Sequence, residues 1–190
     1  VRVLAGDLVP ADGEVVAVAY DHEGENTLTA GGTPLIAKVG YNERGQLAYL
    51  ERTSGPVTTF AYHDTGSNFG RLSLIRHGTA SDAYPDYSYS GYDSVGNLTG
   101  VTVTNANAGS YTYTYDDLNR LATATLSGAG AADFSYTYSY NRLGNLTGRT
   151  GTDPDMTYAY GAGSAGPQAV TSITRSVGDN LAFTYDPRGN

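Results

Sequence analysis

The sequence predicts an all-β protein built of successive antiparallel β-hairpins that form one long meandering sheet. Its composition favours strands over helices, because tyrosine, threonine and valine are abundant and the chain has 17 tyrosines but a single lysine, Lys38. A seven-residue pattern also recurs along the chain, which indicates a repeat architecture. Finally, aromatic and hydroxyl residues alternate with a period of two in segments 111–115 and 134–140, as in a sheet with two unlike faces.

The recurring pattern has tyrosine at position 1, aspartate or asparagine at position 2, and two variable residues at positions 3 and 4. Glycine follows at position 5, a polar residue at position 6 and leucine at position 7. The copies begin at Tyr41, Tyr92, Tyr115, Tyr140 and Tyr185, and a copy with a longer tip runs from Tyr62 to Leu72. The predicted repeat residues are Tyr41, Gly45, Leu47, Tyr62, Leu72, Tyr92, Asp93, Gly96, Leu98, Tyr115, Asp116, Asn119, Leu121, Tyr140, Gly144, Leu146, Tyr185, Asp186 and Gly189.

Each copy is interpreted as the tip of a β-hairpin. The tyrosine closes the incoming strand, and the aspartate or asparagine starts a turn by bonding to its own backbone. Glycine at position 5, or Asn119 in its place, adopts the positive φ that such connections commonly need. The leucine then opens the outgoing strand and points back at the core.

Residues 1–40 are predicted to contain looser copies. The apolar run Val15–Ala19 reads as a strand, and Asp12-Gly13 marks the turn before it. A loose copy of the pattern begins at Tyr20, with Leu28 two places late. Residues 35–41 then form the strand that enters the first clean copy.

Residues 41–190 are predicted to contain clearer repeats. Strands are expected at 47–52, 57–62 and 72–77, and a polar stretch from Gly78 to Asp86 precedes three clean hairpins. Residues 151–176 form a degenerate copy with a flexible, glycine-rich tip at 161–166, and residues 181–185 form the last entering strand. The tyrosine anchors recur every 20 to 30 residues, so the whole chain, 1–190, is expected to be a single repeat segment.

Charge and cysteine content narrow the classes of partner. The formal net charge is −8 and there is no basic stripe, which argues against nucleic acid as a partner. The absence of cysteine excludes disulfides, thiolate metal sites and cysteine nucleophiles. There is no apolar run near 18 residues, so no membrane insertion is expected. The chain opens on Val1 and its last copy stops before its leucine, from which an excised segment is expected.

The tyrosine-aspartate pairs at 92–93, 115–116 and 185–186, with Gly-Asn-Leu at 96–98 and 144–146, resemble the Rhs or YD repeats. This resemblance implies a β-strip that curves and spirals into a hollow shell. In bacterial polymorphic toxins and in the C component of toxin complexes, the shell encloses a toxic C-terminal segment. In the animal teneurins, a similar barrel belongs to a cell-adhesion protein.

The resemblance also implies partners and a location. The expected partners are the rest of the parent shell and its C-terminal cargo, together with self-association through the cut sheet edges. The parent is expected to be secreted or on the bacterial cell surface. Family members carry a self-cleaving core with paired Asp-Pro-x-Gly motifs, and Asp186–Gly189 fits one of them. Since these residues also fit an ordinary repeat tip and no second motif follows, no cleavage activity is carried over.

No residue is predicted to be catalytic or to bind a metal or a cofactor. His22, His63 and His77 lack the spacing of a zinc site and are interpreted as solvated turn residues. Asp64, Asp116-Asp117 and Asp153-Pro154-Asp155 lack the calcium-loop pattern and are interpreted as turn caps.

Two functions are therefore considered. The first is a non-catalytic wall segment of a shell that encapsulates or carries a C-terminal toxin. The alternative is a cell-surface adhesion or carbohydrate-binding module that uses exposed tyrosine stripes. A hydrolase has no positive support in the sequence, so the protein is not expected to be an enzyme.

Overall fold

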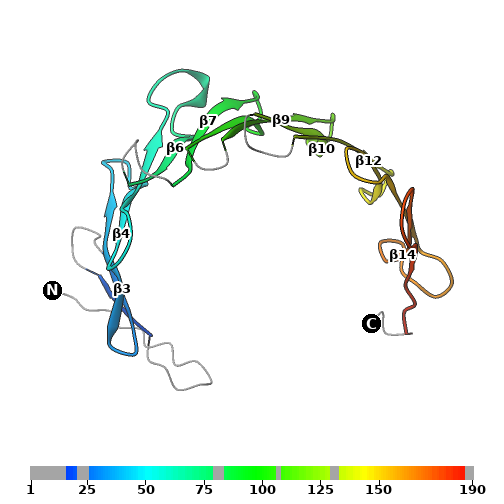
Figure 1. Cartoon of the computed structure of the whole chain (residues 1–190), viewed down its shortest axis with the longest axis horizontal. Coiled ribbons are helices and arrows are strands. Elements are labelled where there is room, and N and C mark those ends of the chain that lie inside the picture. The colour runs from blue at the N-terminus through cyan, green and yellow to red at the C-terminus, as the bar shows by residue number, and fades with distance from the viewer. Residues whose placement is uncertain (1–15, 21–25, 79–83, 106–107, 129–132, 187–190) are drawn as a thin grey trace. The chain divides into compact units, whose positions relative to one another are not determined.

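The computed structural model describes residues 16–20, 26–78, 84–105, 108–128 and 133–186 (Figure 1). These residues form strands joined by turns and a single three-residue 3-10 turn, Gly66–Asn68. The strands are β1 Val16–Tyr20, β2 Asn26–Ala30, β3 Thr33–Tyr41, β4 Leu47–Arg52, β5 Thr58–Tyr62, β6 Leu72–His77, β7 Asp86–Tyr92, β8 Leu98–Thr104, β9 Gly109–Tyr115, β10 Leu121–Ser127, β11 Phe134–Tyr140, β12 Leu146–Gly151, β13 Met156–Tyr160, β14 Val170–Arg175 and β15 Leu181–Ala182.

The order of the strands in the sheet is their order in the sequence, from β1 to β15. Every strand pair whose register is defined is antiparallel, which confirms the predicted all-β strip of successive hairpins. The chain divides into two compact units. Unit 1 comprises residues 1–90 and 102–108, and unit 2 comprises residues 91–101 and 109–190.

The hairpins begin and end at the predicted pattern residues. In the copies that begin at Tyr41, Tyr62, Tyr92, Tyr115 and Tyr140, the incoming strand ends at the tyrosine and the outgoing strand begins at the leucine of position 7. The strand expected at 181–185 is shorter, because β15 ends at Ala182 and Tyr185 lies outside it. In the degenerate copy, Tyr160 and Val170 occupy these two positions. The register then shifts directly after the outgoing strand begins, so that Tyr140 faces Leu146 but Ser139 faces Gly148. The same β-bulge follows at the other tips whose register is defined, where it increases the local twist.

The two faces of unit 2 differ, as the alternation predicts. Tyrosines of β9 and β11 share one face, while the intervening serines and threonines are mostly exposed on the other. Ala124 lies between Tyr113 and Tyr136 in the ladder, and Leu126 lies between Tyr111 and Phe134. Both side chains on β10 are only 6% exposed, because the aromatic rings on each side cover them.

The pattern leucines were expected to point into the core, but the most buried apolar side chains are at other positions. The pattern leucines are half-buried rather than buried, and the buried apolar side chains lie further along the strands, away from the tips. The described residues of each unit form one sheet with no second layer against it, so a side chain is buried mainly by its neighbours in the sheet. The buried apolar residues are Val39, Val101, Val103, Ala124 and Leu126.

Three local expectations in unit 1 were wrong. Asp86 does not end a polar linker but opens β7, where it is 4% exposed and paired with Arg76 at 2.9 Å. His63 and His77 are half-buried rather than solvated. Nε2 of His63 lies 3.0 Å from the carbonyl oxygen of Tyr89, and Nδ1 of His77 lies 2.9 Å from Oγ1 of Thr58. The partners of Asp86 and His77 lie on the neighbouring strand, and the partner of His63 lies on β7, the strand beyond its own hairpin.

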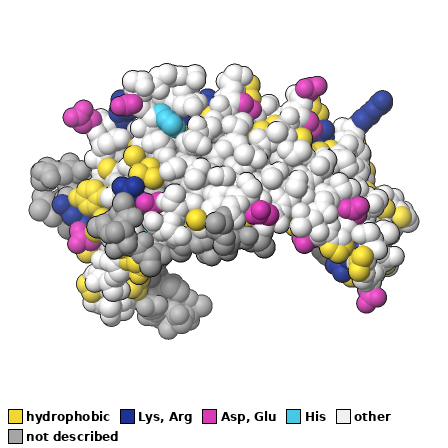
Figure 2. Space-filling view, turned by 45° about the horizontal axis from the view of Figure 1, so that its top comes forward, with side chains coloured by type: hydrophobic (Ala, Val, Ile, Leu, Met, Phe, Trp, Pro, Cys, Tyr) yellow, Lys and Arg dark blue, Asp and Glu magenta, His cyan; other side chains and the backbone are white. Residues whose placement is uncertain are grey.

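Some expectations fall outside the described residues: the strands and turn in residues 1–15, His22, and Pro187 to Gly189. The only helical segment in the described part of the chain is the short 3-10 turn, so no helix there is long and apolar enough to cross a bilayer. Charged side chains of both signs are spread over the face drawn in Figure 2, and most of that face is backbone or side chains that are neither charged nor hydrophobic.

Candidate functional site: the hairpin tips and the bonds between them

The four short tips share one backbone frame. The N–H of position 2 donates to the carbonyl of position 6, and the N–H of position 5 donates to the carbonyl of position 2. These bonds are 2.8–3.2 Å long at all four tips. Oδ1 of position 2 closes the frame, because it accepts from the backbone N–H groups of positions 4 and 6. The position 2 residues are Asn42, Asp93, Asp116 and Asn141.

Position 5 lies in the left-handed region of backbone space in every short tip. Its φ is 72° at Gly45, 103° at Gly96 and 85° at Gly144. Asn119 adopts 59° without being glycine, and asparagine tolerates this region better than most residues. The structure therefore places a positive φ at the position where the pattern predicts it.

Position 6 has two roles that the sequence did not reveal. First, at three of the four short tips its side chain bonds with the side chain of position 2, as in the bond of 2.8 Å from Nδ2 of Asn97 to Oδ2 of Asp93. Second, it reaches the next tip along the sheet. The bonds between tips run from Gln46 Nε2 to Gly70 O (2.7 Å), Asn97 Nδ2 to Asn119 Oδ1 (3.0 Å), Arg120 Nη1 to Asn141 O (3.2 Å) and Asn145 Nδ2 to Pro167 O (2.8 Å).

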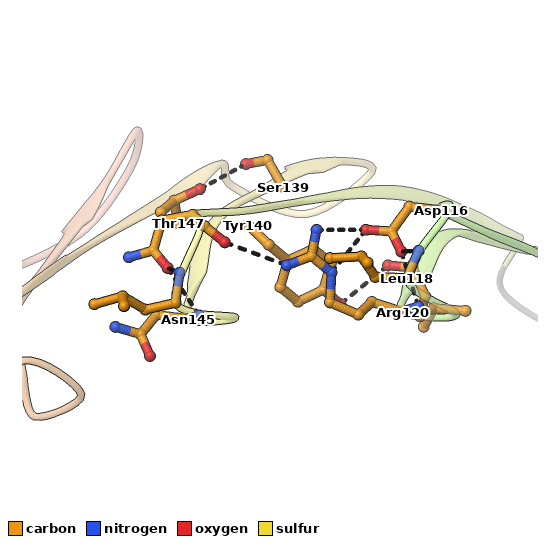
Figure 3. Close-up of polar contacts among 10 residues, drawn as sticks. Asp116, Leu118, Arg120, Ser139, Tyr140, Asn145 and Thr147 are labelled. Atoms are coloured by element: carbon orange, nitrogen blue, oxygen red, sulfur yellow. Dashed lines mark hydrogen bonds and ion pairs between the residues drawn. The ribbon is translucent and has the colours of Figure 1, made fainter.

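Arg120 makes the most extensive of these junctions (Figure 3). Its guanidinium lies 2.6 Å from the Asp116 carboxylate and 4.5 Å from the centre of the Tyr140 ring on the next hairpin. A planar cation held by a carboxylate and stacked on an aromatic ring has little freedom to move. In unit 1, Arg44 makes a similar contact between tips, 4.4 Å from the centre of the Phe69 ring.

The tyrosine hydroxyls provide a second row of bonds between hairpins. Five of the tyrosines that end incoming strands or begin copies donate to the backbone carbonyl of position 7 in the preceding hairpin, and we call these bonds the tyrosine ties. They run from Tyr62 to Leu47 (2.9 Å), Tyr115 to Leu98 (2.7 Å), Tyr140 to Leu121 (3.0 Å), Tyr160 to Leu146 (2.7 Å) and Tyr185 to Val170 (2.8 Å). The repeated choice of tyrosine over phenylalanine is the only signal for them in the sequence.

Electrostatics at the tips follow from these bonds. Desolvation raises the pKa of Asp93, but hydrogen bonds from Asn97 and from backbone N–H groups outweigh it, so the pKa lies below its ordinary value. The pKa of Asp116 is lowered first by the Arg120 hydrogen bond and then by backbone N–H groups. Burial raises the pKa of Tyr115, Tyr140 and Tyr160, which keeps the hydroxyl proton that each tie requires.

The acidic residues outside the short tips have other roles. Asp153 is not a turn cap, since it accepts a hydrogen bond from the Tyr136 hydroxyl and lies 3.7 Å from Arg149. Asp155 accepts from the backbone N–H of Gly151. Asp186 follows Tyr185 and is exposed. Among the described residues, no group of three or more acidic or histidine side chains is placed to hold a metal ion.

Residues 92–132, which include two complete tips, match the family model described as RHS Repeat. The chain therefore carries an Rhs repeat, which confirms the resemblance to Rhs or YD repeats. A chain in the crystal structure of TcdB2-TccC3-Cdc42 is similar over 88% of this chain, with 23% sequence identity and a TM-score of 0.63. This chain spans 9% of that chain's length, and at this identity the similarity shows the fold alone. No curated protein matches the sequence.

Proposed function

We propose that this chain is a non-catalytic wall segment of an Rhs-type shell that encapsulates or carries a C-terminal toxin. The observation that carries this proposal is the double row of bonds between hairpins, at the tips and at the tyrosine ties. In each row, one hairpin bonds to the next through the same kinds of group, and these groups recur along the chain. A further hairpin can therefore be added with the same contacts. A structural role also agrees with the match to an Rhs repeat.

The partners follow from the same proposal. They are the neighbouring repeats of a longer polypeptide and the cargo that the shell would enclose, in a protein that is secreted or on the bacterial cell surface. Among the described residues, β1 and β15 each have a strand on one side only, and such sheet edges favour self-association of the isolated segment. In this proposal the segment forms part of the shell wall, makes that wall rigid, and catalyses no reaction.

Limited proteolysis of the longer polypeptide tests the proposal. We expect the region that follows the repeats to resist proteinase K while the repeats are intact. A variant that carries Tyr115→Phe and Tyr140→Phe should expose that region sooner, because two tyrosine ties are lost. The matched control is Tyr111→Phe and Tyr138→Phe, which removes two hydroxyls from the same face away from the tips. A following region that is digested at once in the unaltered protein would refute encapsulation.

The carbohydrate-binding alternative depends on the tyrosine stripes. Phe134 and Tyr136 stack on one another with ring centres 4.9 Å apart, and Tyr111 and Tyr138 pack at the two ends of this pair at 6.3 and 6.5 Å. Aromatic pairs in such geometries contribute about 0.5–1.5 kcal/mol each to stability. This packing favours a structural role for the aromatic row itself.

A further inference from the structure

Six strands of unit 2 contain only two charged side chains. The strands β9 to β14 consist otherwise of aromatic, aliphatic, hydroxyl-bearing and glycine residues and one methionine, and the two exceptions are Arg149 on β12 and Arg175 on β14. Neither belongs to the repeated pattern, and neither is at a tip. Their presence in an otherwise uncharged part of the sheet is not explained by the bonds between hairpins.

The two arginines lie on either side of Met156. Arg149 faces Met156 across β12 and β13, and Met156 faces Arg175 across β13 and β14. Residues paired across strands point to the same face, so the two side chains flank the methionine on the tyrosine face. Two strand spacings separate their Cα atoms, which is about 10 Å. Two arginine side chains at this separation are long enough to contact one anion between them.

The guanidinium groups lack a full set of acceptors. In both arginines the Nε atom is buried and has no hydrogen-bond partner. Arg149 has weak neighbours, with Nη2 3.7 Å from Asp153 and 3.5 Å from the carbonyl of Pro154. In the described part of the chain, the Arg175 side chain makes no hydrogen bond or ion pair. A half-buried guanidinium whose Nε has no acceptor is costly, and an anion that binds both arginines would offset that cost.

Aromatic rings border the pair. Tyr138 faces Arg149 on β11, and Tyr158 lies two residues from Met156 on the same face. The Tyr158 hydroxyl lies 3.3 Å from the Met156 sulfur. The Arg149 guanidinium stacks 4.8 Å from the centre of the Tyr136 ring, which fixes its plane. A guanidinium can donate two parallel hydrogen bonds to a carboxylate, and half-buried tyrosine rings can stack on a ring of the ligand. The pair therefore suits a ligand that has both a carboxylate and a ring.

We propose that Arg149 and Arg175 bind the carboxylate of an acidic sugar above Met156, and that Tyr138 and Tyr158 receive the sugar ring. An anionic ligand is proposed because Arg149 and Arg175 are the only charged side chains on strands β9 to β14. The carboxylate supplies acceptors to both guanidinium groups, and the ring replaces water on the two tyrosines. The ligand class is a polysaccharide that contains uronic acids.

Calorimetric titration of the 190-residue chain with a tetrasaccharide of galacturonic acid tests the site. We expect Arg175→Gln or Arg149→Gln to weaken binding at least tenfold, while Arg142→Gln, which changes an exposed arginine at a tip of the same unit, leaves it unchanged. Binding should also weaken as salt concentration rises. Thermal unfolding of each variant, compared with the unaltered chain, separates lost binding from lost folding.

Three results would overturn the proposal. The first is failure of the unaltered chain to bind the acidic tetrasaccharide. The second is equal binding of a tetrasaccharide of galactose, which would show that the carboxylate is not recognised. The third is competition by inorganic sulfate at the same concentration as the tetrasaccharide, which would show that the rings contribute nothing.

Discussion

The tips at 115–121 and 140–146 are consecutive copies in unit 2 that differ at every polar position. The first has Asp116, Asn119 and Arg120, where the second has Asn141, Gly144 and Asn145. Their backbone bonds nonetheless agree closely, at 2.9 and 2.9 Å in the first tip and 3.0 and 3.1 Å in the second. The spacing therefore sets the turn, while the side chains decide how each tip contacts the next.

The two tips also make their contacts by different means. The first is held by an ion pair and presents a cation to the following hairpin, whereas the second uses neutral amide bonds throughout. The first should therefore respond to acid and salt, and the second should not. Four predictions test this contrast.

The largest effect is expected for Gly144→Val. A β-branched residue at a φ of 85° is strained, and we expect a loss of about 1–2 kcal/mol in the free energy of unfolding. Urea unfolding followed by circular dichroism measures this loss. The control is Leu143→Val, which changes a side chain that is 61% exposed and should cost no more than about 0.5 kcal/mol. Equal losses in the two variants would contradict the assignment of position 5.

The next effect is expected for Tyr140→Phe, which joins the two compared tips. Removal of the hydroxyl leaves the carbonyl of Leu121 without its donor, at a cost of about 1 kcal/mol. Hydrogen exchange at the amides of β10 and β11 should increase. Tyr138→Phe keeps the ring on the same strand and removes a hydroxyl that donates to no residue in the described ranges, so it should be neutral. A neutral Tyr140→Phe would show that the tie is not stabilising.

Acid should weaken the first tip and leave the second unchanged. The pKa of Asp116 in the folded chain lies below its ordinary value of 3.8, so its stabilising contribution is complete above that value. It is lost as the pH falls from 3.8 through the folded pKa, because protonation removes the ion pair with Arg120. Amide exchange at both tips between pH 6 and pH 3, corrected for the intrinsic rate, measures the difference.

Exchanged variants sharpen this test. Asp116→Asn should remove the acid response of the first tip, and Asn141→Asp should create one at the second. Asp93 adds a further acid-sensitive tip at 92–98, since its pKa is also lowered. Identical acid profiles at 115–121 and 140–146 in the unaltered chain would contradict the contrast.

The smallest effect is expected for Asn119→Gly. Glycine relieves the strain of a φ of 59°, but the substitution removes the acceptor for the Asn97 side chain. These contributions oppose one another, so the net change should be within about 0.5 kcal/mol. A double-mutant cycle with Asn97→Ala measures the lost bond separately. Additive effects would mean that the two asparagines are not coupled.

The sequence predicted the hairpins well because their signals are local. A tyrosine, a turn-forming residue, a glycine and a leucine at fixed spacing define where one strand ends and the next begins. The positive φ at Asn119 also follows from the pattern alone, since position 5 requires it. The β-bulge after each leucine was missed, because an extra residue on one strand is visible only against its partner.

Contacts between hairpins could not be read from the sequence in the same way. The tie from Tyr140 to Leu121 joins residues 19 apart, and their distance depends on loops that vary in length from copy to copy. The burial of Asp86 was missed for a related reason. Its partner Arg76 is on the neighbouring strand, and a polar segment between them resembles a linker. Arg149 and Arg175 follow no repeated spacing, so their alignment across β13 appears only in the register.

The acceptor of every tyrosine tie is a peptide carbonyl, which each kind of amino acid possesses. Val170 accepts from Tyr185 as readily as leucines accept elsewhere. Neighbouring copies therefore need not evolve together, since only the ring hydroxyl and the loop geometry are constrained. Such a strip can gain, lose or exchange a hairpin through recombination of its gene. The tyrosine of the inserted hairpin can still donate to a backbone carbonyl of the hairpin before it.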